Sequence, residues 1–185
     1  MREIKNRLTV ESQSLTALKN QLATNQKHWA ARPAIQPIDN KQLTQLYLTY
    51  GERLHPLLGY SRPHNGLDFA APFNTPIYAT GDGVVVYAEG GTTYGNVVFV
   101  NHSFGFETRY AHMSRYVVSV GEKVKRGQIL GYVGNTGLSF GNHLHYEVLY
   151  QNKFVNPINF FQRDLNNLEY EKLISLASKS NLLMD

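Results

Sequence analysis

The chain has 185 residues, 42% of them hydrophobic and 12% aromatic, which is enough for one compact domain with appended segments. It contains no cysteine, which excludes disulfides and thiolate metal sites. The formal net charge of +4 favours an anionic environment, but the basic residues are too dispersed to indicate nucleic-acid binding.

Residues 1–30 contain neither glycine nor proline and predict a single helix. A heptad stripe, interrupted by Glu11 and Asn25, is formed by Ile4, Leu8, Leu15, Leu18, Leu22 and Trp29. The stripe fits a short coiled coil, through which the chain could self-associate or bind an envelope protein. It fits equally well an amphipathic helix packed on its own domain. Residues 31–50, with two prolines, end the helix and form a linker and lead-in.

Residues 51–161 alternate short β-prone runs with glycine-containing turns about every ten residues. This spacing predicts a mainly β fold, a small antiparallel sheet of the barrel or sandwich type, and no βαβ rhythm is visible. Residues 162–185 carry leucines at helical spacing and predict a C-terminal helix docked on the sheet, followed by a tail.

The first informative histidine stands in the segment R-P-H-N-G-L-D-F, where His64 and Asp68 are four residues apart. Pro63 and Gly66 make a helix improbable, so a loop entering a strand has to bring the two side chains together. Alone, this pair indicates a metal site only weakly.

The segment G-N-H-L-H-Y-E-V-L-Y is more specific because strand side chains alternate between two faces. His143 and His145 point one way, whereas Leu144, Tyr146 and Val148 point the other way and are expected to pack on the core. The two histidines then face a groove or the surface, about 7 Å apart. They could serve as one metal ligand and one acid or base, or be exposed polar residues.

His112 ends a predicted strand in R-Y-A-H-M-S, where a lone histidine is usually structural. Together, however, the three segments fit a catalytic zinc site, since two neutral imidazoles and one carboxylate leave a position open for water. Zinc lowers the pKa of bound water to about 7, and the two remaining histidines could transfer protons. The sequence therefore predicts a hydrolase with one zinc ion per chain.

The segments H-N-G-L-D, Y-A-H-M and H-L-H-Y-E, in this order, resemble the lysostaphin/LytM-type family of zinc endopeptidases, which cut peptide bonds in bacterial peptidoglycan. The resemblance covers about residues 51–161 and implies a small antiparallel β core crossed by a groove. It implies that His64, Asp68 and His145 are the metal ligands, and that His112 and His143 are the catalytic histidines.

The flanks resemble envelope-anchored, Gram-negative-like members of this family, in which a membrane helix and a coiled coil precede the catalytic domain. The segment M-R-E-I-K-N-R-L-T-V lacks the apolar core of a secretory signal, and no apolar stretch approaches the roughly 20 residues of a membrane helix. The resemblance thus implies a periplasmic protein whose anchor or signal is absent from this chain.

The expected function is hydrolysis of peptidoglycan cross-links or stem peptides by attack of metal-bound water. A D,D cross-link is favoured over a glycine-rich bridge. The alternative is a non-catalytic or latent envelope module that regulates another cell-wall hydrolase. Family members with the non-catalytic role lack some zinc ligands, whereas this chain keeps all of them.

Further residues accompany these motifs. Tyr60, Tyr94 and Asn96 stand in segments that could line a substrate groove. Glu147 shares the strand face of the paired histidines and could orient an imidazole, but a plain surface carboxylate fits equally well. His102, near the end of a predicted strand, is expected in a turn or on the surface.

Overall fold

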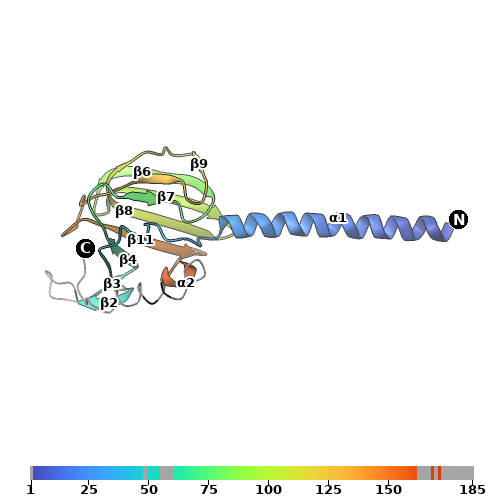
Figure 1. Ribbon diagram of the computed structural model, residues 1–185, viewed down its shortest axis with the longest axis horizontal. Coiled ribbons are helices and arrows are strands. Elements are labelled where there is room, and N and C mark those ends of the chain that lie inside the picture. Colours follow the sequence, from blue (N-terminus) through green and yellow to red (C-terminus); the bar gives the residue numbers. More distant parts are fainter. Residues whose placement is uncertain (1, 48–49, 55–60, 162–167, 169–170, 172–185) are drawn as a thin grey trace. The chain divides into compact units, whose positions relative to one another are not determined.

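The computed structural model describes residues 2–47, 50–54, 61–161, 168 and 171 (Figure 1). Within these described residues, helix α1 spans Arg2–Ala31 and helix α2 spans Ile158–Phe161. The strands run over Gln45–Tyr47 (β1), Gly51–Leu54 (β2), Ser61–His64 (β3), Gly66–Ala70 (β4), Pro76–Tyr78 (β5), Gly83–Thr92 (β6), Gly95–Ser103 (β7), Phe106–Tyr116 (β8), Lys123–Val124 (β9), Ile129–Val133 (β10), His143–Tyr150 (β11) and Lys153–Val155 (β12).

The chain divides into two compact units, residues 1–30 and residues 31–185. Helix α1 accounts for the first unit and ends at Ala31, because the residue that precedes Pro33 disfavours helical backbone. Its heptad stripe carries large side chains that are more than half exposed, namely Leu15, Leu18, Leu22 and Trp29. In the described part of the chain, no helix combines the length and apolar character of a membrane span.

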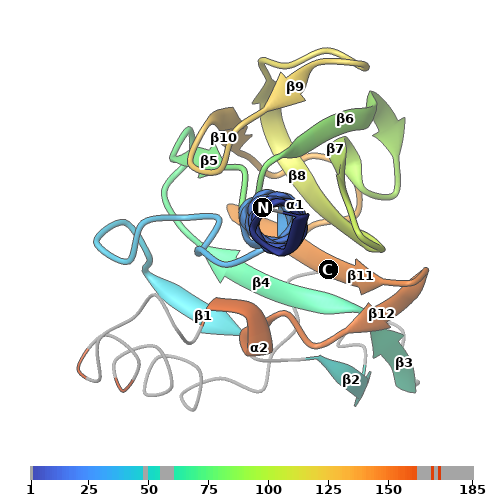
Figure 2. The ribbon, with the colours of Figure 1, turned by 90° about the vertical axis from the view of Figure 1, so that its right-hand side faces the viewer.

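The second unit is a ten-stranded antiparallel sheet with a separate β2–β3 hairpin. The main path runs β1-β4-β11-β8-β7-β6-β9, while β10 pairs with both β5 and β8, and β12 pairs with β11. Figure 2 shows the long strands β4, β11, β8, β7 and β6 following one another across the domain. The expected mainly β, antiparallel fold is therefore confirmed.

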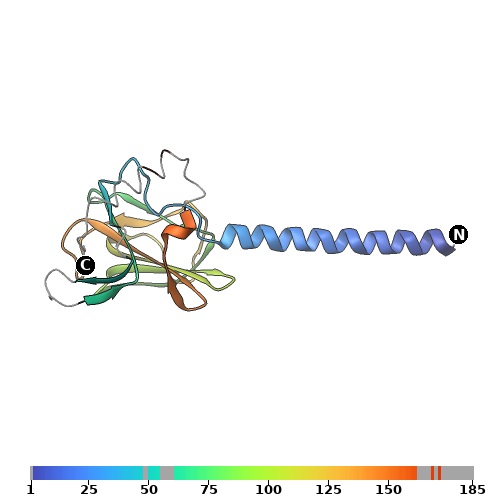
Figure 3. The same ribbon diagram turned by 90° about the horizontal axis from the view of Figure 1, so that it is seen from below.

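The short helix α2 lies on the side of the second unit away from β6 in Figure 1, and it is seen from that side in Figure 3. The ring of Phe160 packs edge-on against Phe106, with 5.8 Å between the ring centroids. The C-terminal helix expected over residues 162–185 lies outside the described residues, except for Leu168 and Glu171.

The core is built on one face of β11, where Leu144, Tyr146 and Val148 are completely buried. The alternation of side chains along the strand predicted that these three residues would face the core, and their burial confirms it. The side chains come from most of the long strands, and the largest fully buried ones are Tyr110, Tyr146, Phe69, Ile38, Leu46, Leu67, Ile77, Met113, Leu130 and Leu144.

Two buried tyrosines bring hydroxyl groups into this core, and a chain of hydrogen bonds satisfies them. The hydroxyl of Thr80 lies 3.0 Å from that of Tyr110 and 2.9 Å from that of Tyr146. The Tyr110 hydroxyl also lies 3.0 Å from the hydroxyl of Thr108. Because buried polar groups are costly without partners, this chain allows tyrosine where an apolar residue would otherwise be needed.

His102 continues the same network and is only 1% exposed, so the expectation of a turn or surface position is wrong. Its Nδ1 donates to the carbonyl oxygen of Asp82 at 2.9 Å, and its Nε2 lies 2.7 Å from the hydroxyl of Thr108. Burial lowers the pKa of His102 to about 4, because the charged imidazolium would lose its hydration.

The depressed pKa of His102 predicts a pH-dependent stability. Between pH 6.5 and about 4 the unfolded chain binds a proton at His102 that the folded chain does not. This contribution to the free energy of unfolding is complete above pH 6.5 and falls by on the order of 3 kcal/mol as the pH drops to about 4.

Urea denaturation of the wild type and of His102→Gln at several pH values checks this expectation. The difference in free energy of unfolding between the two proteins should shrink as the pH falls through that window. A difference that stays constant across the window would contradict it.

Candidate metal centre

The centre is built on the register of three neighbouring strands, β4, β11 and β8. Residues directly opposite each other in antiparallel strands present their side chains on the same face. His145 of β11 lies opposite Asp68 of β4 and, on its other side, opposite Ala111 of β8. His64 ends β3, two residues before β4 begins at Gly66, and reaches the same place. The register thus brings together residues that are up to 81 positions apart in the sequence.

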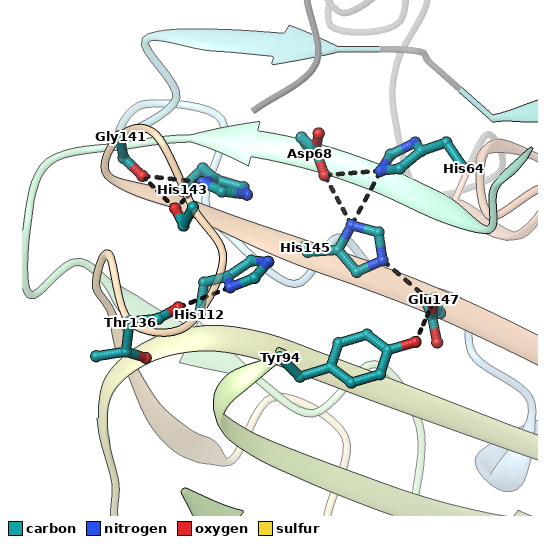
Figure 4. A network of polar contacts seen from close by, with 10 residues as sticks. His64, Asp68, Tyr94, His112, Thr136, Gly141, His143, His145 and Glu147 are labelled. Carbon is teal, nitrogen blue, oxygen red and sulfur yellow. Dashed lines mark hydrogen bonds and ion pairs between the residues drawn. The ribbon is translucent and has the colours of Figure 1, made fainter. Parts of the chain in front are cut away.

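Three potential ligand atoms converge at this place (Figure 4). The Nδ1 of His145 lies 3.0 Å from the Nε2 of His64 and 2.9 Å from the Oδ1 of Asp68. The third side of the triangle, His64 Nε2 to Asp68 Oδ1, is 3.2 Å. All three side chains are buried.

The triangle has nearly the dimensions of one face of a tetrahedral metal site, where ligands 2.0–2.1 Å from the ion lie about 3.3 Å apart. The chemistry of the donors fits as well. The Nε2 of His145 lies 3.2 Å from the Oε1 of Glu147, and a proton there leaves the Nδ1 lone pair facing the lone pairs of Asp68. Such an arrangement is stabilised by a cation between the atoms. His64, Asp68 and His145 can therefore hold a metal ion.

Gly66 creates the space in which the His145 ring lies. A Cβ atom at Gly66 would stand 2.5 Å from the carbonyl oxygen of Tyr146 and 3.0 Å from two atoms of the His145 imidazole. Glycine within the H-N-G-L-D segment is thus required by the close approach of β11, first its Tyr146 carbonyl oxygen and then the His145 ring, and not by a turn.

His112 reaches this face because of an irregularity in β8. Tyr110 pairs with Tyr146 and points to the core, so simple alternation would send His112 there too. The β7–β8 register shifts between Tyr110 and Met113, and His112 adopts a φ of +60°. This β-bulge turns His112 toward His145, with 6.0 Å between the ring centroids, and places Met113 in the core.

His112 and His143 are held in the same way. The Nδ1 of His112 donates to the carbonyl oxygen of Thr136 at 2.8 Å, and the Nδ1 of His143 donates to that of Gly141 at 2.9 Å. When these rings are neutral, each proton is therefore on Nδ1 and the lone pair is on Nε2. The ring centroids lie 4.8 Å apart, which makes the two imidazoles neighbours beside the ligand triangle.

A pocket opens onto this group and reaches both the ligand triangle and His112. It is lined by Pro63, His64, Asn65, Thr93, Tyr94, His112, Leu138, His145 and Glu147. The polar face of β11 is buried along its length, with His143 at 0%, His145 at 3% and Glu147 at 1% exposure. This face is therefore not an open surface, and its His145 and Glu147 line the pocket.

The groove candidates differ in their placement. Tyr94 lines the pocket and donates its hydroxyl to Glu147 at 2.9 Å. Burial, followed by the charge of Glu147, raises the pKa of Tyr94 to about 12, so its hydroxyl stays protonated. Asn96 donates its side-chain amide to two backbone carbonyl oxygens of β8, which indicates a structural role. Tyr60 lies outside the described residues.

Sequence reasoning overlooked several residues that complete the centre. Thr136 and Ser139 lie on the loop before β11, where Thr136 accepts from His112 and the Ser139 hydroxyl lies 3.2 Å from His143 Nδ1. Arg109 lies opposite Glu147 in β8. Single polar residues of this kind carry no sequence signal, because only the tertiary structure brings them to the histidines.

The contacts of Gly66 predict a large effect of one methyl group. In Gly66→Ala the new Cβ would clash with the carbonyl oxygen of Tyr146 and crowd the ring of His145. Strand β4 must therefore move away from β11, and the His145 ring must shift. We expect a loss of about 1–3 kcal/mol in the free energy of unfolding, as is usual for overpacking, and weakened binding of divalent metal. Gly121→Ala is the control for metal affinity: its positive φ makes alanine destabilising through the backbone alone, with open space around the new Cβ, so it should lose stability but bind metal as the wild type does. Equal metal affinity of Gly66→Ala and wild type would contradict this view.

The left-handed backbone of His112 predicts an unusual order of stability between two variants. Glycine normally destabilises a strand relative to alanine, but a φ of +60° costs an L-residue about 1–2 kcal/mol. His112→Gly should therefore be at least as stable as His112→Ala in thermal unfolding. A clearly lower melting temperature for the glycine variant would count against strain at this position.

The part of the chain that carries the ligand triangle is similar in sequence to known peptidases. Residues 62–157 match Peptidase family M23. Peptidoglycan DD-endopeptidase ShyA of Vibrio cholerae serotype O1 is 48% identical over 106 residues, which cover 57% of this chain and 25% of the relative. DD-carboxypeptidase/endopeptidase Mpg of Neisseria meningitidis serogroup B is 43% identical over 115 residues, which cover 62% and 26%.

Among solved structures, a zinc-containing peptidase from Vibrio cholerae matches with a TM-score of 0.60 at 37% identity, covering 69% of this chain and 39% of that one. The chain spans about a quarter of the length of the two curated relatives. The matched residues make up more than half of the chain and contain the ligand triangle and the two further histidines. They confirm the resemblance seen in the motifs, and the chain belongs to peptidase family M23.

Proposed function

We propose that the chain is a zinc-dependent endopeptidase that hydrolyses peptide cross-links of bacterial peptidoglycan, most specifically a D,D bond. The observation that carries this proposal is the convergence of His64, Asp68 and His145 on one buried point beside two further histidines. Two nitrogen donors and one oxygen donor form a common catalytic zinc set. Zinc bound there supplies a Lewis acid that polarises a carbonyl group and acidifies water.

His112 and His143 handle the protons of the reaction. With their Nδ1 protons committed to backbone carbonyls, both present Nε2 as the atom that can accept a proton. Peptide hydrolysis requires a base for the attacking water and an acid for the leaving amine. Two adjacent imidazoles can share these tasks, and an imidazolium can also stabilise a developing oxyanion.

The pocket positions the peptide. His64, His145 and His112 all line it, so a substrate amide that enters it lies next to the ligand triangle and to one proton-transfer group. Tyr94 and Asn65 contribute polar side chains to the lining of the pocket, and Leu138 contributes an apolar one. The named activities of the relatives ShyA and Mpg support a D,D bond as the target. A peptidoglycan substrate supports a location in the bacterial cell envelope, and we infer the periplasm as the compartment.

An assay on isolated sacculi tests the proposal. The purified chain is incubated with sacculi in the presence of zinc, and separately with a chelator, and mass spectrometry identifies the released fragments. We expect zinc-dependent release of muropeptides cleaved at the D,D cross-link. His64→Ala should lose both zinc and activity. His143→Ala should retain zinc while the rate falls by about 10²–10⁴.

His28→Ala is the matched control, since this histidine lies on the exposed surface of α1, and it should match the wild type. A zinc-loaded wild-type chain that releases no cleaved peptide would refute the proposal. That result would instead favour a latent or non-catalytic module that regulates another hydrolase.

A further inference from the structure

Glu147 carries a buried carboxylate next to the ligand triangle, and the fold surrounds it with donors. It is 1% exposed, so its charge needs strong compensation. Its Oε1 accepts from the hydroxyl of Tyr94 at 2.9 Å and lies 3.2 Å from the Nε2 of His145. Its Oε2 lies 3.6 Å from a guanidinium nitrogen of Arg109.

Arg109 is itself fixed in place. Its guanidinium carbon lies 4.5 Å from the ring centroid of Phe99 and 5.4 Å from that of Phe154. Its Nε donates to Glu107 at 2.9 Å. Burial alone would lower the pKa of Arg109, but the two glutamates raise it. A permanent cation thus stands beside Glu147 on the neighbouring strand.

These contacts hold the Glu147 carboxylate in one orientation, directed at the ring nitrogen of His145 that is remote from the ligand triangle (Figure 4). A carboxylate accepts a hydrogen bond and cannot donate one when it is ionised. It therefore favours the His145 tautomer with the proton on Nε2 and the lone pair on Nδ1, the atom that faces Asp68.

We propose that Glu147, held by Arg109 and Tyr94, is a positioning residue that fixes the tautomer and ring orientation of His145 for metal binding. The inference rests on the proposed function, because it assumes a metal at His64, Asp68 and His145. Carboxylates that accept from a metal-bound histidine also make the imidazole a stronger donor to the metal. Without Glu147, the ring can rotate or protonate Nδ1, and both changes remove a ligand.

The test measures zinc affinity at one fixed pH by competition with a chromophoric chelator. Glu147→Ala should bind zinc about 10–100-fold more weakly than the wild type. Glu147→Gln keeps an oxygen acceptor but loses the charge, and its affinity should fall by less, up to about tenfold. In the zinc-loaded wild type, proton NMR should show a downfield imidazole N–H that is absent from Glu147→Ala.

The chain offers a matched control in Glu89, which accepts from the hydroxyl of Tyr87 at the same 2.9 Å but on the exposed surface. Glu89→Ala and Glu89→Gln should bind zinc as the wild type does. Thermal unfolding of the metal-free proteins separates a loss of stability from a loss of affinity, and the isosteric glutamine variant serves if the alanine variant does not fold.

Wild-type zinc affinity in both Glu147 variants would overturn the positioning role and leave the proposed function standing. A wild-type chain that binds no zinc would overturn both. Weaker binding in the Glu147 variants, with unchanged Glu89 variants, would establish the role.

Discussion

The pairing of β11 with β4 and β8 is the constraint on which the site depends. It sets His145 opposite Asp68 on one side and Ala111 on the other, and Glu147 opposite Arg109. A one-residue slip of β11 would send its histidines into the core and its apolar residues into the pocket, so the core and the site enforce the same register. The tyrosine hydroxyl chain among Thr80, Tyr110 and Tyr146 reinforces that register from the core side. The metal centre is thus held by strands whose positions the apolar core already determines.

The sequence was sufficient to predict the helix at the start of the chain, the antiparallel β fold and the two faces of β11. These features depend on local patterns, namely the lack of glycine and proline in α1 and the alternation around Leu144 and Tyr146. The convergence of His64 and Asp68 on His145 did not follow from spacing, because it depends on contacts between segments 77 and 81 residues apart in the sequence. Only the family motifs connected them in advance.

Three features could not be read from the sequence for specific physical reasons. His112 faces the site because a bulge changes the phase of alternation in β8, and no glycine marks that bulge. His102 is buried because the hydroxyl of Thr108 and a backbone carbonyl satisfy it, whereas histidine at a strand end is usually exposed. The strand position of Glu147 fits an exposed carboxylate as well as one that orients a histidine. The feature that favours the second is Arg109 opposite it in β8, and strand pairing of this kind is not visible in the sequence.

The two buried carboxylates of the site have different sources of compensation. Glu147 faces the guanidinium of Arg109, a cation that belongs to the chain and is always charged. Asp68 faces the imidazoles of His64 and His145, which are neutral when they act as metal ligands. A divalent ion held by these three side chains would add positive charge next to Asp68. The chain itself thus supplies the cation next to Glu147, whereas a metal bound at His64, Asp68 and His145 would couple its binding to the stability of the strands that carry these residues.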